Sequence, residues 1–409
     1  MNILFITIIP KIKQRMTLEL AKELVQRGNR VLIACPEDAL NKASDTFTSI
    51  DGMDYLFVAS GYSVGKVKFL KKVKDFLSLD AAFGRAVSKA LSGEKIDLIL
   101  YSTPPITLAN TIAKIKKLHQ AKTFLMLKDI FPQNAVDMGM MRKTGITGLV
   151  WRYFRAKERQ LYRISDRIGC MSPANCRYVC AENPDISPEK VDLCVNAYAL
   201  GPVLHVDQTV VREKYGIPTN RTVFLYGGNL GKPQGLDYFV RVMQENVNKP
   251  DRFFLICGGG NDQKTIEDFI DQNKPDNVKF MSSIPADDFD VLSRACDVGL
   301  VFLDHRFTIP NFPSRMLSIM LNEKPILAAT DKNTDVGEVI ADGNMGWWCE
   351  SADTTPFNDF IDSICADPET AAQKGRNARI YFESHYTTKI ACDQILEGVS
   401  QIDGSKHAK

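Results

Sequence analysis

The sequence contains no run of eighteen apolar residues, which excludes a helix apolar enough to span a membrane. The charge is also nearly balanced. A net charge of +2 excludes a generally basic protein that binds nucleic acid. The first nine residues are apolar, but they lack the basic start and the small-residue cleavage site of a signal peptide. We expect them to form a buried strand instead.

Paired metal-ligand motifs are absent as well. The ten cysteines are scattered, and several lie inside apolar runs. Such thiols indicate a reducing compartment, so we expect a cytoplasmic protein without a disulfide framework. Cys170, Cys176 and Cys180 are close in sequence but lack Cys-x-x-Cys spacing and a neighbouring histidine, which argues against a zinc site. The five histidines offer no catalytic triad.

The length and the apolar pattern predict two α/β domains. A chain of 409 residues is too long for one core and suits two domains of about 200 residues each. Short apolar runs alternate with helical segments, which is typical of parallel sheets covered on both faces. The runs lie at residues 2–9, 30–35, 97–101, 123–127, 166–172 and 191–198, and again at 221–227, 253–257, 278–280, 298–302 and 325–328. Residues 200–220 between the two sets have the composition of a linker.

Residues 310–330 are the most informative stretch. Pro313, Ser314 and Arg315 open an apolar helix, an Asn-Glu-Lys-Pro break closes it, and a short strand follows. Free amides at a helix start bind anions, a serine oxygen can cap them, and an arginine adds a bidentate phosphate donor. The alternative is an ordinary junction between a loop and a helix.

Two glycine-rich turns strengthen this interpretation. Residues 223–237 read as a buried strand, then a loop with Gly227, Gly228, Gly231 and Lys232, and then a helix. A second strand runs into the glycines 258–260. Glycines let a backbone approach a ligand closely. Together these turns predict a nucleotide diphosphate at the carboxyl ends of parallel strands.

The same motifs carry a resemblance to a known family. The order Gly-Gly-Asn-Leu-Gly-Lys-Pro-Gln-Gly, Cys-Gly-Gly-Gly and Pro-Ser-Arg-Met-Leu-Ser-Ile-Met is similar to the donor half of a family 4 (group 1) glycosyltransferase of the GT-B fold. Residues 128–139 resemble the Asp-Leu-Trp-Pro-Glu-Ser stretch of the L-fucosamine-transferase-like subgroup of bacterial surface polysaccharide synthesis. Residues 101–107 and 375–387 also fit. The similarity runs from residue 1 to about residue 400.

This resemblance implies two Rossmann-like, doubly wound domains facing across a cleft. Residues 1–200, with a crossover helix at about 385–401, would bind the acceptor, and residues 207–384 the nucleotide sugar. It implies a retaining hexosyltransferase that uses a UDP-sugar and needs no metal cofactor. The acceptor would be a polyprenyl-diphosphate-linked saccharide at the inner face of the cytoplasmic membrane.

The resemblance also assigns residues to the donor site. Lys232 and Arg315 would stabilise the departing diphosphate and serve catalysis. Further donor contacts would come from positions around them, namely Gly228, Asn229, Gly258, Pro313, Ser314, the amides of Met316 and Leu317, and Ser318. Asp129 follows the strand 124–127, so we expect it at a carboxyl end as the acid-base residue. The alternative is a helix N-cap after Pro132.

The sequence departs from the family pattern at several positions. Pro310 and Ser318 stand where the family carries two glutamates. These positions therefore do not indicate the donor sugar or a retaining outcome, as the glutamates would. Ser318 could make only a weaker bond to the ribose. Asn229 and Gln234 stand where many relatives carry arginine and lysine. His305 lies just before the donor loop and could touch the sugar.

Two basic and apolar segments lie in the predicted acceptor domain, at residues 66–77 and 142–157. Amphipathic helices with basic flanks can lie on an anionic membrane. The alternative is a pair of helices packed on the sheet with solvated cations.

Two other functions stay open. A nucleotide-sugar 2-epimerase shares the GT-B architecture, and a catalytically inactive binding partner is compatible with the missing glutamates. A Rossmann dehydrogenase is disfavoured because residues 9–15, after the first strand, contain no glycine.

Overall fold

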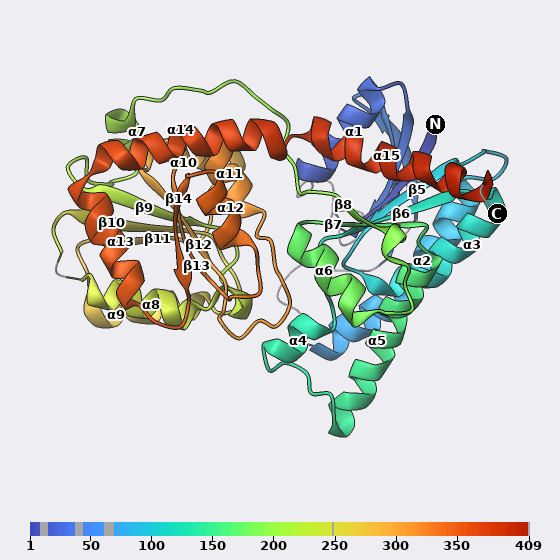
Figure 1. The fold of residues 1–409 in the computed structure, drawn as a ribbon, viewed down its shortest axis with the longest axis horizontal. Coiled ribbons are helices and arrows are strands. Elements are labelled where there is room, and N and C mark those ends of the chain that lie inside the picture. The colour runs from blue at the N-terminus through green and yellow to red at the C-terminus, as the bar shows by residue number, and fades with distance from the viewer. Residues whose placement is uncertain (9–14, 37–43, 61–68, 248, 408–409) are drawn as a thin grey trace. The chain divides into compact units, whose positions relative to one another are not determined.

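The computed structural model describes residues 1–8, 15–36, 44–60, 69–247 and 249–407. The chain divides into two units, which we describe separately (Figure 1). Unit 1 comprises Met1–Ala199 and Thr387–Lys409, and unit 2 comprises Leu200–Tyr386. Residues 200–206, part of the predicted linker, thus belong to unit 2. Among the described residues, no helix combines the length and the apolar character needed to cross a membrane.

Unit 1 is built on an eight-stranded sheet in the order β3-β4-β2-β1-β5-β6-β7-β8. Only the β3–β4 pair is antiparallel, and the other neighbours run parallel. The strands are β1 Asn2–Ile6, β2 Arg30–Pro36, β3 Thr46–Ile50, β4 Met53–Val58, β5 Leu98–Ser102, β6 Lys122–Leu127, β7 Arg167–Cys170 and β8 Val191–Leu193. The central strands are buried almost throughout, as expected for a parallel sheet with helices on its faces.

The helices of unit 1 connect and cover these strands. They are α1 Arg15–Gln26, α2 Phe69–Ala90, α3 Ala109–His119, α4 Gln133–Asp137, α5 Gly145–Ile164, α6 Pro173–Glu182 and α15 Thr388–His407. The last helix returns to unit 1 and packs on α1, where Arg27 Nη1 lies 2.5 Å from Asp393 Oδ1. The expected helix at about 385–401 is therefore present, although it begins at Thr388 and continues to His407.

Unit 2 holds a six-stranded sheet in the order β11-β10-β9-β12-β13-β14, and all neighbouring strands are parallel. The strands are β9 Thr222–Gly227, β10 Arg252–Cys257, β11 Val278–Met281, β12 Val298–Phe302, β13 Ile326–Thr330 and β14 Gly346–Glu350. The helices are α7 Gln208–Lys214, α8 Leu236–Glu245, α9 Gln263–Asn273, α10 Ala286–Ala295, α11 Arg315–Leu321, α12 Val336–Asp342, α13 Thr355–Ala366 and α14 Pro368–His385.

An aromatic cluster forms part of the core of unit 2. Phe302 on β12 is fully buried, and its ring centroid lies 4.6 Å from that of Phe239 and 5.3 Å from that of Phe357. Tyr226, near the end of β9, belongs to the same cluster, with its ring centroid 6.0 Å from that of Phe302 and 5.6 Å from that of Phe239. This cluster supports the strand ends from which the glycine-rich loops leave.

We predict that Phe302→Ala destabilises the protein by about 4 kcal/mol, because it leaves a large cavity between three aromatic rings. The measurement is denaturant unfolding of the full chain. Ile380→Ala on the exposed face of α14 is the matched control, with an expected change within about 0.5 kcal/mol. Equal stability of the two variants would contradict the assignment of this core.

Candidate active site

Three loops of unit 2 leave the same edge of the sheet. The glycine-rich turns begin where β9 ends at Gly227 and where β10 ends at Cys257. The long loop that leads to α11 begins where β12 ends at Phe302. Because all strands of this sheet are parallel, these loops share its carboxyl edge, where α/β sheets bind their ligands. The predicted donor residues are thus brought to one edge.

The two glycine-rich turns are interlocked. Gly258 has φ +142°, and a methyl group added to it would lie 1.9 Å from the Gly228 carbonyl oxygen. Only glycine allows this close approach. The Leu230 amide donates to the Gly259 carbonyl at 3.1 Å, so the turns also share a backbone bond. Gly228 itself has φ +134°, which L side chains rarely adopt.

Arg315 lies over this pair of turns. Its guanidinium carbon is 4.6 Å from the ring centroid of Tyr226, the distance of a cation–π contact. A methyl group added to Gly228 would lie 3.5 Å from the same carbon. Arg315 Nη1 is buried and has no hydrogen-bond partner among the described residues. A guanidinium with an N–H donor that lacks a partner is suited to receive an anion.

Lys232 adds a second positive charge to this edge. It begins the short helix η4 Lys232–Gln234 and is exposed, and its side chain forms no hydrogen bond or ion pair within the described ranges. The loop before it is braced from within, since Gln234 Oε1 accepts from Asn229 Nδ2 and from the Gly231 amide, each at 3.2 Å. Asn229 and Gln234, which stand where many relatives carry arginine and lysine, therefore contact each other.

The start of α11 differs from the expectation. Ser314 is the N-cap residue, but its side chain makes no capping bond. The amides of Met316 and Leu317 donate at 3.1 Å to the carbonyls of Pro313 and Ser314, and both residues are fully buried. The first turn of α11 therefore already uses both amides, and their expected contact with the donor stays a prediction. The Ser314 hydroxyl has no partner among the residues that the structure describes.

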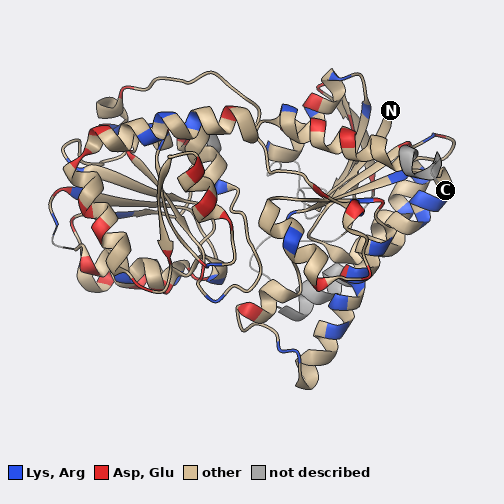
Figure 2. Ribbon diagram, viewed as in Figure 1, with Lys and Arg blue, Asp and Glu red and all other residues tan. Residues whose placement is uncertain are grey.

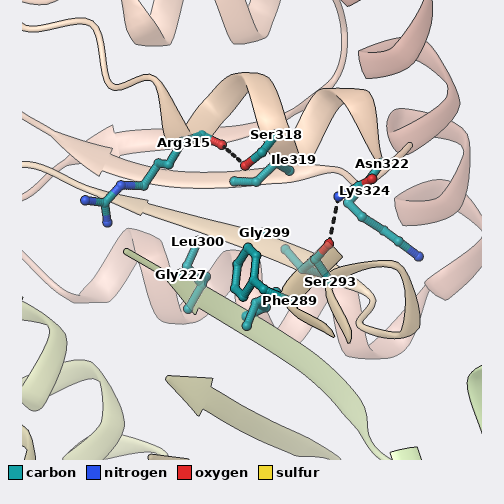
Figure 3. A pocket seen from close by; sticks show the side chains of 12 residues that line it. Gly227, Phe289, Ser293, Gly299, Leu300, Arg315, Ser318, Ile319, Asn322 and Lys324 are labelled. Carbon is teal, nitrogen blue, oxygen red and sulfur yellow. Dashed lines mark hydrogen bonds between the residues drawn. The ribbon is translucent and has the colours of Figure 1, made fainter. Parts of the chain in front are cut away.

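Ser318 and Pro310 occupy the two glutamate positions of the family pattern. The Ser318 hydroxyl donates to the Arg315 carbonyl at 2.8 Å, and Pro310 is buried. Ser318, Arg315 and Gly227 line a cavity of about 30 Å³ together with Phe289 and Lys324 (Figure 3). That volume is enough for one or two water molecules, so this cavity is too small to hold a nucleotide.

His305 lies in the loop that leads to α11. Its ring is half exposed, with Nδ1 3.8 Å from Asp304 Oδ1. Asp304 is buried and accepts from Arg306 Nη2 at 2.6 Å and from Nε at 2.8 Å. Burial opposes ionisation of Asp304, but the bonds from Arg306 outweigh it and lower its pKa. The Asp304–Arg306 pair holds this turn, and His305 remains accessible.

Asp129 belongs to unit 1 and follows the end of β6 after one residue, Lys128, as the sequence predicts. Its two carboxylate oxygens accept from Asn134 Nδ2 at 2.8 and 2.9 Å. Burial raises the pKa of Asp129 to about 6, although the bonds from the Ile130 amide and Asn134 act in the other direction. The alternative of a helix N-cap is wrong, because α4 begins after Pro132 without a side-chain cap.

Two residues of this architecture were missed by sequence reasoning. Tyr226 supports the Arg315 guanidinium, and its only sequence signal is an aromatic residue at the end of a strand that precedes two glycines. Lys128 precedes Asp129, and its ammonium has no partner in the described part of the chain. Burial lowers its pKa. It lies in the stretch 128–139 that resembles the family, but the burial of a lysine cannot be read from its residue type.

Family models match both units. Residues 14–198 match Glycosyltransferase Family 4, and residues 207–381 match Glycosyl transferases group 1. Together these matches cover most of the chain, which therefore belongs to the glycosyltransferases. The two parallel-sheet units have the GT-B fold.

Named relatives and solved structures agree with this class. The chain is 24% identical to the glycosyltransferase WbjE of Pseudomonas aeruginosa, over 69% of the chain and 70% of the relative. It is 23% identical to the colanic acid biosynthesis glycosyl transferase WcaI of Escherichia coli K12, over 60% of each.

The solved structures are similar in fold over nearly their whole length. A sucrose-phosphate synthase from Thermosynechococcus elongatus has a TM-score of 0.77 at 15% identity, with 99% of each chain covered. Anabaena HepE in complex with UDP-glucose has a TM-score of 0.73 at 16% identity, covering 98% of this chain and all of that one. WaaG, a glycosyltransferase involved in lipopolysaccharide biosynthesis, has a TM-score of 0.67 at 13% identity over the same shares.

We predict that Asp129 makes stability depend on pH. Its pKa is about 6 in the folded protein and lower in the unfolded chain, so its stabilising protonated form is lost as pH rises through about 6. Relative to Asp129→Asn, the unfolding free energy of the wild type should fall by about 2 kcal/mol between about pH 4 and about pH 7. Denaturant unfolding at a series of pH values measures this difference.

The variant Asn134→Ala provides a second test of the same carboxyl group. It removes the two bonds that favour the ionised form of Asp129. The pKa of Asp129 should therefore rise further, and the fall in stability should move to higher pH. If the unfolding free energies of the wild type and Asp129→Asn changed with pH in the same way, the prediction would be contradicted, because the pKa of Asp129 would then not be raised by folding.

Proposed function

We propose that this protein is a hexosyltransferase that moves a sugar from a UDP-sugar to a lipid-linked saccharide in bacterial surface polysaccharide biosynthesis. The observation that carries the proposal is the guanidinium of Arg315. It is stacked on Tyr226 beside Gly228, and it has no anionic partner among the described residues. A nucleotide diphosphate is an anion that suits this position.

The chemistry of transfer gives this cation a role. When the bond from the sugar to the diphosphate breaks, negative charge develops on the departing phosphate oxygens. Positive groups already in place stabilise that charge more than they stabilise the bound donor. Arg315 offers a planar pair of N–H donors, and Lys232 offers a mobile point charge. We propose that these two residues suffice for the leaving group and that no metal is required.

The comparisons support the donor and the pathway. The HepE structures contain UDP and UDP-glucose, and that fold extends over nearly all of this chain, which favours a UDP-sugar as donor. The name of WcaI refers to colanic acid biosynthesis and the description of WaaG to lipopolysaccharide, which favours a surface polysaccharide as product. The stretch around Asp129 favours the L-fucosamine-transferase-like subgroup within the family.

For the acceptor we propose a polyprenyl-diphosphate-linked saccharide bound by unit 1. Asp129 lies at the carboxyl edge of the sheet of unit 1, with its pKa raised to about 6 by burial. A carboxyl group with this pKa can accept the proton of an acceptor hydroxyl near neutral pH. A lipid-linked acceptor would also place the enzyme on the inner face of the cytoplasmic membrane.

The full chain incubated with labelled UDP-sugars, with and without membranes that carry lipid-linked saccharide, tests the proposal. Label transferred to lipid only when membranes are present is the expected result. Conversion of free nucleotide sugar into its 2-epimer would instead establish an epimerase. Binding without turnover would establish an inactive binding protein.

We predict that Arg315→Ala weakens UDP binding about 30-fold and that Lys232→Ala weakens it about tenfold, because each removes charge-assisted bonds to the diphosphate. Arg315→Lys should bind more weakly than the wild type, because an ammonium cannot supply two parallel donors. Isothermal titration calorimetry with UDP gives these affinities.

Arg376→Ala on α14 and Lys249→Ala remove exposed cations of the same unit away from the glycine-rich turns, and both should bind UDP like the wild type. If both site variants also kept wild-type affinity, the nucleotide would bind elsewhere.

A further inference from the structure

Unit 1 carries an exposed apolar surface at the start of α5 that the transfer chemistry does not use. We call residues 139–153 the α5 tip. It includes the side chains of Met140, Arg142, Lys143, Ile146, Leu149, Arg152 and Tyr153, all of them exposed. Ile146 is 86% exposed and Leu149 is 65% exposed. In Figure 1 this end of α5 lies far from the strands of its unit.

The α5 helix is apolar on two faces rather than one. One face, with Phe154, Leu161 and Tyr162, is buried within unit 1. Ile146, Leu149 and Tyr153 follow at spacings of three and four residues, which places them together on another face. An apolar stripe turned to solvent at the end of a helix has no role in packing its own unit.

The charges that the tip itself carries are all positive. One acidic residue of α2 lies nearby, because burial and then the Asp80 carboxylate raise the pKa of Tyr153. Residues 138–157 contain no aspartate or glutamate, whereas they contain three arginines and two lysines (Figure 2). Lys143 lies over the ring of Trp151, with its ammonium 5.6 Å from the centroid. Glu158 is the first acidic residue after this stretch, and it is buried and bound to Arg155 and Tyr162. Its charge therefore does not offset the cations of the tip.

We propose that the α5 tip docks on the surface of an anionic lipid bilayer, with Ile146 and Leu149 inserted and Arg142, Lys143 and Arg152 at the lipid headgroups. Apolar side chains beside cations are the combination that such a surface binds. A second copy of the chain fits less well, because a symmetric contact would bring the cations of both copies together. The inference rests on the proposed function, since it assigns the membrane contact to a defined surface.

The second basic segment predicted from the sequence, residues 66–77, does not enter this argument. Residues 61–68 and the side chains of residues 69–77 lie outside the described part of the structure. The α5 tip therefore carries the inference alone.

Flotation of the full chain with lipid vesicles tests the proposal. The wild type should bind vesicles of phosphatidylcholine with phosphatidylglycerol and should bind pure phosphatidylcholine at least tenfold more weakly. The double variant Ile146→Asp, Leu149→Asp should reduce binding to the anionic vesicles at least tenfold. Arg142→Ser, Lys143→Ser should also reduce it, and the remaining binding should depend less on salt.

Leu118→Asp on α3 is the matched control, because Leu118 is 64% exposed in the same unit but lies outside the tip. It should bind vesicles like the wild type. A wild type that does not bind anionic vesicles would overturn the proposal, as would a tip variant that binds them unchanged. So would a concentration-dependent dimer that the tip variant abolishes, because the tip would then join two copies.

Binding of UDP by the same variants separates this inference from the proposed function. The tip variants should keep wild-type affinity for UDP in calorimetry. Vesicle binding by a wild type that transfers no sugar would refute the proposed function and leave the docking surface standing. Sugar transfer without vesicle binding would support the proposed function and refute the docking surface.

Discussion

The structure of unit 2 depends on the close approach of two backbones at the carboxyl edge of its sheet. The Gly228 carbonyl lies where any side chain on Gly258 would have to be, so the turns after β9 and β10 can pack against each other only as glycines. This contact keeps both turns low over the strand ends. Arg315 can then reach across them and stack on Tyr226 without meeting an acidic partner. The position of the Arg315 cation at this edge therefore depends on how the two turns pack as well as on the residue being an arginine.

In the proposed transfer reaction, unit 2 would supply cations and unit 1 would supply a carboxyl group. In unit 2, positive groups face an open edge and can stabilise a departing diphosphate. In unit 1, Asp129 is held by Asn134 at the end of β6, where burial raises its pKa toward the range useful for proton transfer. Both groups follow buried parallel strands. In both sheets the loops after parallel strands lie at the carboxyl edge. This edge therefore carries cations in unit 2 and a carboxyl group in unit 1.

Much of the fold could be predicted because buried parallel strands are nearly continuous apolar runs. The strand β4 is mostly buried and lies inside the sheet, and its short apolar run was overlooked. The strand β3 was missed because it alternates partly buried and exposed residues and carries few large apolar side chains, so it does not read as a core strand. The strand β14 was missed for a similar reason, since three of its five residues are only partly buried. Edge strands such as β3 and β14 are partly exposed to solvent, so a search for continuous apolar runs overlooks them.

The sequence by itself determined which residues gather at the candidate site, because glycine-rich turns after strands and the Pro-Ser-Arg turn are local features. Only the tertiary structure decided what each group is free to do. The amides of Met316 and Leu317 are engaged by their own turn, while Arg315 Nη1 is left without a hydrogen-bond partner among the described residues. Hydrogen-bond partners and burial arise from contacts between segments far apart in the chain, and a residue's type does not contain them.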